Sequence, residues 1–144
     1  MAKEIRTEIN IRTTPEKIWT ILTDFEKYPQ WNPFITSIKG QVEQGNKIQV
    51  RIEPPNGKGM TFNPTVITKD KNKELRWLGK LLFSGLFDGE HKFELIDNGN
   101  GTVTFIQSEK FTGIFVWMFN PEKTRQGFME MNKKLKELVK EEKE

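Results

Sequence analysis

A single histidine and a nearby glutamate are the residues of this chain best suited to chemistry. His91 is the only histidine among 144 residues, and there is no cysteine. A histidine-rich metal site, a thiolate metal site and a thiol nucleophile are therefore excluded. His91 and Glu109 could instead act as a general base and the carboxylate that orients it, which makes His91 the candidate catalytic residue.

Other catalytic motifs are missing from the sequence. A serine triad would have to use Ser37, Ser84 or Ser108, and strand alternation points Ser108 away from His91. There is no G-x-S-x-G motif, and the glycines at 57 and 59 precede a predicted strand rather than the helix that a phosphate-binding loop needs. We therefore expect neither a metal nor a cofactor.

The segments that must position His91 have the pattern of a β-hairpin. Residues 87–96 and 102–111 alternate between apolar and polar types on either side of an Asn- and Gly-rich turn. The register we expect places His91 opposite Gln107. One face of the hairpin then holds Phe87, His91, Phe93, Leu95, Val103, Phe105, Gln107, Glu109 and Phe111.

Three residues on this otherwise apolar face are polar, namely His91, Gln107 and Glu109. Burying such groups without partners costs about 1–3 kcal/mol each, and more for a charge. They could form a satisfied network, with Glu109 at a wet end of its strand. Alternatively, they could project into a cavity between the sheet and a helix, where they would orient a mostly apolar ligand.

The rest of the chain predicts a sheet with short helices near its start. Residues 3–11 alternate as a half-buried strand, and Thr14 followed by Pro15 predicts the start of a short helix. Pro64 donates no ladder hydrogen bond, so we expect an edge or a bulge at that point. Further strands are expected at 35–39, 47–53, 60–69 and 74–82.

The last element is a long amphipathic helix. Asn120 can cap it and Pro121 opens it. Gly127 in its middle costs about 1 kcal/mol relative to alanine, which suggests that space is needed above the sheet or that the helix packs closely on it. The expected apolar stripe is Thr124, Phe128, Met131, Leu135 and Leu138.

This element order predicts an α+β fold, with one curved antiparallel sheet wrapped around the C-terminal helix, as a single domain over residues 1–144. Hydrophobic residues make up 35% of the chain and the formal net charge is +3 at pH 7. There is no concentrated basic face for nucleic acid, no transmembrane segment and no signal peptide pattern. We expect a cytoplasmic protein.

The most apolar run of the chain covers residues 113–119, where the last strand must cross to the helix. It could cover the open end of the core. Alternatively, it could form a surface that contacts lipid or a partner protein.

Several segments resemble the START-like superfamily, the polyketide cyclase/dehydrase and lipid transport group that is often labelled SRPBCC and shares its fold with the birch-pollen allergen. The resemblance spans nearly the whole chain and is specific for fold rather than function. It is carried by Ile18–Phe25, Tyr28–Phe34, Leu75–Gly79, Gly89–Leu95, Glu109–Gly113 and Gly127–Phe128.

The resemblance implies a helix-grip fold, in which a seven-stranded curved antiparallel sheet surrounds the long C-terminal helix and two short helices after the first strand close one end. Such proteins usually hold an apolar cavity between helix and sheet. Members bind lipids, sterols, polyketides or plant hormones, some act as cyclases, and others assist the heat-shock chaperone ATPase or present quinones. The family shares no catalytic motif that could be carried over.

We therefore expect the protein to bind, transport or sense a small hydrophobic molecule such as a lipid, a polyketide or another aromatic compound. One alternative is a polyketide cyclase-like enzyme that uses His91. Another is a protein-interaction module such as a chaperone ATPase activator. The sequence leaves the oligomeric state open. The predicted ligand-binding residues are Phe62, Trp77, His91, Phe93, Phe105, Gln107, Glu109, Gly127, Phe128 and Met131.

Overall fold

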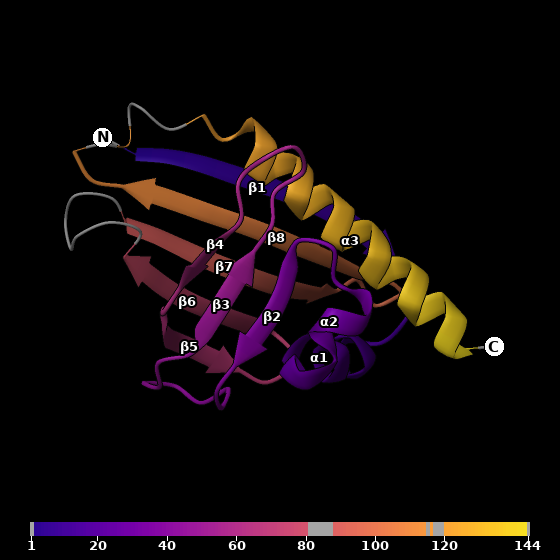
Figure 1. Cartoon of the computed structure of the whole chain (residues 1–144). Coiled ribbons are helices and arrows are strands. Elements are labelled where there is room, and N and C mark those ends of the chain that lie inside the picture. Colours follow the sequence, from indigo (N-terminus) through magenta and orange to yellow (C-terminus); the bar gives the residue numbers. More distant parts are fainter. Residues whose placement is uncertain (1, 81–87, 115, 117–119, 144) are drawn as a thin grey trace.

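Two antiparallel sheets and one long helix surround the hydrophobic interior (Figure 1). The structure is a computed structural model that describes residues 2–80, 88–114, 116 and 120–143. The elements in chain order are β1 (Ala2–Ile11), α1 (Pro15–Thr23), η1 (Phe25–Lys27), α2 (Tyr28–Trp31), β2 (Ile35–Lys39), β3 (Gln49–Ile52), β4 (Met60–Phe62), β5 (Thr65–Asp70), β6 (Glu74–Lys80), β7 (Asp88–Asp97), β8 (Val103–Thr112) and α3 (Glu122–Lys143).

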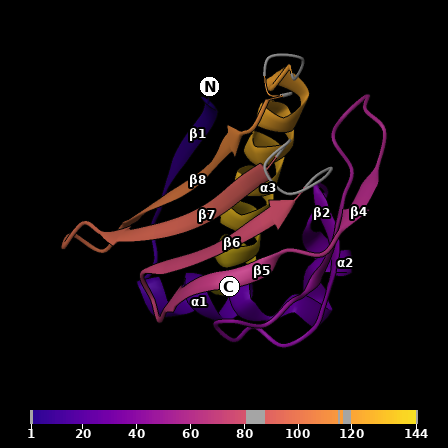
Figure 2. The same cartoon turned by 90° about the vertical axis from the view of Figure 1, so that its left-hand side faces the viewer.

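Helix α3 lies against one face of the larger sheet, whose strand order is β1-β8-β7-β6-β5 (Figure 2). Strands β2, β3 and β4 form the smaller sheet. The short helices α1 and α2 follow β1 near the C-terminal end of α3 (Figure 1). This arrangement confirms the predicted helix-grip fold.

Pro64 divides the strand that was expected at 60–69. Strand β4 pairs with β3, whereas β5 pairs with β6, so the two halves belong to different sheets. Backbone hydrogen bonds still join the sheets at this point, because Ile48 N donates to Pro64 O at 3.0 Å and Val66 N donates to Asn46 O at 2.9 Å. Seven strands were expected, and the described part of the chain has eight. The two sheets meet at Pro64, which cannot donate a hydrogen bond to a neighbouring strand.

The register of the β7–β8 hairpin differs from the prediction by two residues. His91 pairs with Glu109 rather than with Gln107. The prediction was wrong because Thr102 belongs to the turn: Asn100 Oδ1 accepts hydrogen bonds from Thr102 N at 3.2 Å and from its hydroxyl at 2.6 Å. Since side chains alternate with a period of two, this shift keeps the described residues of the predicted inner face together, while Phe87 lies outside the described residues.

Both predicted helix starts are confirmed by their capping bonds. Thr14 Oγ1 accepts from Lys17 N at 3.3 Å, and Asn120 Oδ1 accepts from Glu122 N at 3.1 Å. No helix in the described part of the chain is both long and apolar enough to cross a membrane. The inner face of α3 buries Phe128, Met131, Leu135 and Val139.

Gly127 provides room for an aromatic ring. A Cβ atom at this position would collide with Cδ1 of Phe34, which comes from the segment just before β2. The Phe34 ring also meets Phe128 edge to face, with the ring centroids 5.5 Å apart. The space that Gly127 leaves is therefore occupied by a side chain that joins the smaller sheet to α3.

Only part of the apolar run 113–119 can be placed. Ile114 is 63% exposed and Val116 is fully buried. Residues 115 and 117–119, the rest of the run for which a core cover or a contact surface was expected, lie outside the described residues.

Candidate functional site

A cavity of about 380 Å³ lies between the smaller sheet, strands β6 to β8 and the start of α3. We call it the central cavity. Aliphatic and aromatic side chains make up most of its wall. The described residues that line it are Phe34, Ile35, Val50, Ile52, Pro54, Lys58, Met60, Phe62, Trp77, His91, Glu109, Phe111 and Thr124.

Four of the ten predicted ligand-binding residues line this cavity. They are Phe62, Trp77, His91 and Glu109. The other six lie behind the wall or in the core and are buried. These six are Phe93, Phe105, Gln107, Gly127, Phe128 and Met131.

The smaller sheet supplies lining residues that the sequence analysis did not select. Val50 and Ile52 alternate along β3 and both line the cavity. Their alternation is visible in the sequence, but nothing in it shows that β2 to β4 fold over the same interior as the hairpin. Phe34, from a proline-rich loop, has no comparable pattern.

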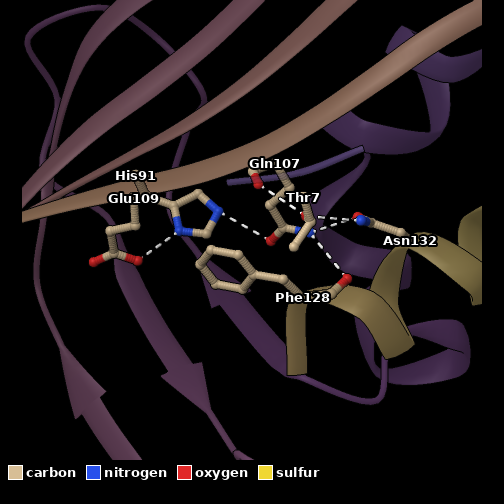
Figure 3. Close-up of polar contacts among 6 residues, drawn as sticks. All are labelled: Thr7, His91, Gln107, Glu109, Phe128 and Asn132. Atoms are coloured by element: carbon tan, nitrogen blue, oxygen red, sulfur yellow. Dashed lines mark hydrogen bonds and ion pairs between the residues drawn. The ribbon is translucent and has the colours of Figure 1, made fainter. Parts of the chain in front are cut away.

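His91 and Glu109 form a direct hydrogen-bonded pair at the cavity wall (Figure 3). His91 Nδ1 lies 2.9 Å from Glu109 Oε1, and the two side chains are only 5% and 11% exposed. The pair follows from the corrected register, which places the two residues opposite each other on adjacent strands.

A relay of buried polar groups holds the other side of the His91 ring (Figure 3). His91 Nε2 lies 3.1 Å from Gln107 Oε1, and Gln107 Nε2 donates to Asn132 Oδ1 at 2.8 Å. Asn132 Nδ2 in turn donates to Thr7 Oγ1 at 2.9 Å. The relay joins β7, β8, α3 and β1, so the position of His91 is fixed from three other elements.

The relay also determines which nitrogen of His91 carries a proton. Thr7 must donate its hydroxyl proton to the carbonyl oxygen of Gln107, 2.9 Å away, because a carbonyl only accepts. Asn132 must then donate to Thr7 and accept from Gln107, which leaves the Gln107 side-chain oxygen facing His91. His91 Nε2 is therefore the donor to Gln107.

Aromatic rings pack around His91. Trp77 stacks on it with the ring centroids 5.1 Å apart and the planes 19° apart. Phe128 meets it edge to face at 5.0 Å, and Phe93 lies tilted at 4.6 Å. With these rings on its faces and both nitrogens in hydrogen bonds, His91 has no free nitrogen in the described structure.

Glu109, in contrast, keeps one oxygen free. Its Oε1 is bound to His91, and among the described residues Oε2 has no hydrogen-bond partner (Figure 3). The three polar residues therefore differ in their surroundings: Gln107 belongs to a satisfied network, while Glu109 lines the cavity. That they orient a ligand stays a prediction.

A larger hollow of about 620 Å³ lies outside the sheets, between α1, α2 and the end of α3. Charged residues of the surface line much of it, including Lys17 and Glu142, whose side-chain atoms Nζ and Oε2 lie 3.4 Å apart. It has no buried polar side chain among its described lining residues. We therefore take the central cavity as the candidate site, because apolar walls and a few convergent polar groups are typical of ligand sites.

The described residues contain no group of three or more histidine, aspartate or glutamate side chains that could hold a metal ion. Both ring nitrogens of His91 and one oxygen of Glu109 are engaged in hydrogen bonds, whereas no hydrogen bond within the described residues engages Glu109 Oε2 or the side chains of Lys58 and Thr124. What the arrangement can do is bind an apolar molecule and accept a hydrogen bond or a proton from it.

A protein-family model matches nearly the whole chain. The family described as "Polyketide cyclase / dehydrase and lipid transport" matches residues 2–140. No curated protein matches the sequence.

Solved structures with the same fold include proteins of different kinds. A START superfamily protein from Mycobacterium smegmatis is 18% identical, with a TM-score of 0.73, and 96% of this chain and 97% of that chain are covered. Norcoclaurine synthase from Thalictrum flavum, in complex with dopamine and hydroxybenzaldehyde, is 14% identical with a TM-score of 0.76, covering 98% and 88%. Major latex-like protein 151 from Panax ginseng is 9% identical with a TM-score of 0.79, covering 96% and 98%. At these identities the likeness shows the fold alone.

Proposed function

This chain belongs to the polyketide cyclase/dehydrase and lipid transport family, and from that premise we propose that it binds a small hydrophobic molecule in the central cavity. The observation that carries the proposal is the cavity itself. Its volume of about 380 Å³ is well above that of a packing defect and lies at the lower end of the range of ligand pockets, ~300–1,000 Å³.

The composition of the wall supports an apolar ligand. Val50, Ile52, Phe62 and Trp77 line the cavity, and a ligand that covers them removes apolar surface from water on both sides. Such burial contributes roughly 25 cal/mol per Å² before the costs of binding are subtracted. The His91–Glu109 pair is the polar feature that could orient the ligand within this wall.

Catalysis is a second candidate, and the free oxygen of Glu109 is the observation that favours it. A carboxylate at a cavity wall that faces a bound molecule can act as a general base, with His91 as the residue that positions it. A catalytic role for His91 itself stays a prediction, but both of its nitrogens are engaged. The fold also occurs in norcoclaurine synthase, so it is compatible with an enzyme as well as with a carrier.

Native mass spectrometry after gentle purification, followed by a thermal-shift screen of lipids and aromatic polyketides, tests the binding proposal. A ligand at 100 times its Kd should raise the Tm by about 5–10 °C. The variant Ile52→Trp places a larger ring in the cavity wall and should weaken binding of the same ligand at least fivefold.

The matched control is Ile96→Trp, since Ile96 is 46% exposed and does not line the cavity. This variant should bind as the wild type does. If no compound of either class shifts the Tm, or if Ile52→Trp binds as tightly as the control, the proposal fails. Turnover of a bound ligand that disappears in Glu109→Gln, while binding persists, would favour the enzyme instead.

A further inference from the structure

The free oxygen of Glu109 limits the polar groups that a ligand can bring to this part of the cavity. The 2.9 Å contact between His91 Nδ1 and Glu109 Oε1 requires one proton between these atoms. His91 Nε2 already carries its own proton, because Gln107 presents an oxygen to it. Two placements of the shared proton remain, on His91 Nδ1 or on Glu109 Oε1.

Glu109 Oε2 is an acceptor in both placements. If His91 holds the proton, Oε2 belongs to a carboxylate; if Glu109 holds it on Oε1, Oε2 is the carbonyl oxygen of the acid. Neither form has a proton on Oε2. A ligand group that meets this atom must therefore be a hydrogen-bond donor.

The charge of the pair favours a neutral donor. The pair is neutral in both placements, either as a protonated histidine with a carboxylate or as a neutral histidine with a neutral acid. An ammonium group on the ligand would add a buried charge with no net counter-charge, and burial of an unpaired charge is costly. A carboxylate on the ligand would place a second acceptor against Oε2.

The other polar side chains among the described lining residues do not change this preference. Lys58 is exposed, so its ammonium group is solvated and attracts an anion only weakly. Thr124 lies at the start of α3 and carries a hydroxyl that can both donate and accept. Neither selects a charged ligand.

Aromatic rings form much of the remaining wall. Phe34, Phe62, Trp77 and Phe111 line the cavity, and rings of this kind pack well against a flat ring in offset or edge-to-face geometry. The volume of about 380 Å³ suits a molecule of two or three rings better than a long lipid.

We infer that the ligand is a small aromatic molecule with a neutral hydroxyl group, which donates a hydrogen bond to Glu109 Oε2 while its rings pack among Phe62, Trp77 and Phe111. This inference rests on the proposed function and adds the chemical class of the ligand. The relay from Thr7 through Asn132 and Gln107 serves to hold His91, which in turn holds Glu109 with Oε2 available.

Equilibrium dialysis of the full chain against four naphthalene compounds tests the class. The compounds are 2-naphthol, 2-methylnaphthalene, 2-naphthoate and 2-(aminomethyl)naphthalene. The expected order places 2-naphthol at least tenfold tighter than 2-methylnaphthalene, since a hydrogen bond to the acceptor at the cavity wall distinguishes two molecules of similar size. Both charged compounds should bind more weakly than 2-methylnaphthalene.

The variant Glu109→Met then removes the acceptor and keeps an apolar side chain of similar length. The preference for 2-naphthol over 2-methylnaphthalene should fall below threefold. Glu90→Met is the matched control on the outer face of the sheet, where Glu90 pairs with Arg76, and it should keep the wild-type preference. If Glu109→Met does not fold, the four-compound series on the wild type still decides the question.

The outcomes separate this inference from the proposed function. Equal binding of all four compounds, tightest binding of a charged compound, or an unchanged preference in Glu109→Met overturns the inference and leaves apolar binding intact. Failure of all four compounds to bind at millimolar concentration overturns the inference. That result leaves the proposed function standing, which fails only on its own tests, the broader lipid and polyketide screen and the Ile52→Trp comparison.

Discussion

His91 and Glu109 lie directly opposite each other on β7 and β8, with His91 Nδ1 2.9 Å from Glu109 Oε1. The pair stands at the boundary between a satisfied polar network and the central cavity. Gln107 holds one nitrogen of His91 and Glu109 holds the other. The same histidine therefore belongs to the buried network and, under the proposed function, holds the carboxyl group that meets the ligand.

His91→Leu should lower the free energy of unfolding by about 2–4 kcal/mol, because it leaves the Gln107 side-chain oxygen and the Glu109 carboxyl without their partner. Urea denaturation at pH 7 measures the change. Lys92→Leu, on the outer face of the same strand, is the control and should cost less than about 1 kcal/mol. Equal stability of the two variants would show that the relay contributes nothing.

The proton on His91 Nε2 can be observed directly, since this chain has one histidine. Nitrogen-15 NMR of the folded protein at pH 7 should show Nε2 protonated and hydrogen-bonded. The reason is that the backbone carbonyl of Gln107 fixes the Thr7 hydroxyl and, through it, both amide side chains. An unprotonated Nε2 would contradict the relay and with it the acceptor role of Glu109 Oε2.

Gly127→Ala should destabilise the protein by about 1–2 kcal/mol, although alanine has the higher helix propensity. The added methyl group meets the Phe34 ring. Such overpacking typically costs more than the roughly 1 kcal/mol that the higher helix propensity of alanine contributes to stability. Thermal or urea unfolding measures the difference.

Gln126→Ala, at the exposed neighbouring position, is the matched control for Gly127→Ala and should be neutral or slightly stabilising. The double variant Gly127→Ala/Phe34→Leu should recover part of the loss, because the smaller side chain leaves room for the methyl group. A Gly127→Ala protein more stable than the wild type would show that Phe34 moves aside without cost.

Tyr28 should make stability fall at alkaline pH. Its side chain is fully buried and its hydroxyl donates to Leu22 O at 2.6 Å. Burial, helped by the nearby charge of Asp24, raises the pKa of Tyr28 above its ordinary value. As the pH rises, Tyr28 therefore loses its proton first in the unfolded chain, near pH 10. Below that pH the protonated Tyr28 makes its full contribution to the free energy of unfolding.

Above pH 10 this one group should lower the free energy of unfolding by up to about 1.4 kcal/mol per pH unit. Tyr28→Phe should remove that part of the pH dependence and cost about 1 kcal/mol at pH 7 through the lost hydrogen bond. Because the chain has a single tyrosine, the difference between the two proteins isolates it. Parallel pH profiles for the wild type and Tyr28→Phe would refute this account of Tyr28.

Much of the fold could be predicted from local patterns. Thr14 and Asn120 are helix caps because their side-chain oxygens satisfy free backbone N–H groups, and those residue types are visible in the sequence. The described residues on the inner face of the β7–β8 hairpin were predicted correctly, although the predicted register was wrong by two residues. Side chains alternate with a period of two, so a shift of two leaves each side chain on the same face. The residue opposite His91 was predicted wrongly, because the register depends on how Asn100 and Thr102 close the turn.

The candidate site could be predicted only in part, because a cavity is a relation between elements distant in the chain. His91 and Glu109 were found because polar residues on an apolar face need an explanation. Val50 and Ile52 were not, since their role depends on the smaller sheet folding over the hairpin through the junction at Pro64. No local pattern indicates that Phe34 would pack on Gly127.

The central claim, that the cavity between the sheets and α3 receives an apolar ligand, is tested most directly by intermolecular NOEs between 2-methylnaphthalene and the protein. The account predicts contacts from the compound to the methyl groups of Val50 and Ile52 and to the ring of Trp77. Contacts to Ile21 and Leu138 instead, in the outer hollow between α1 and the end of α3, would contradict it.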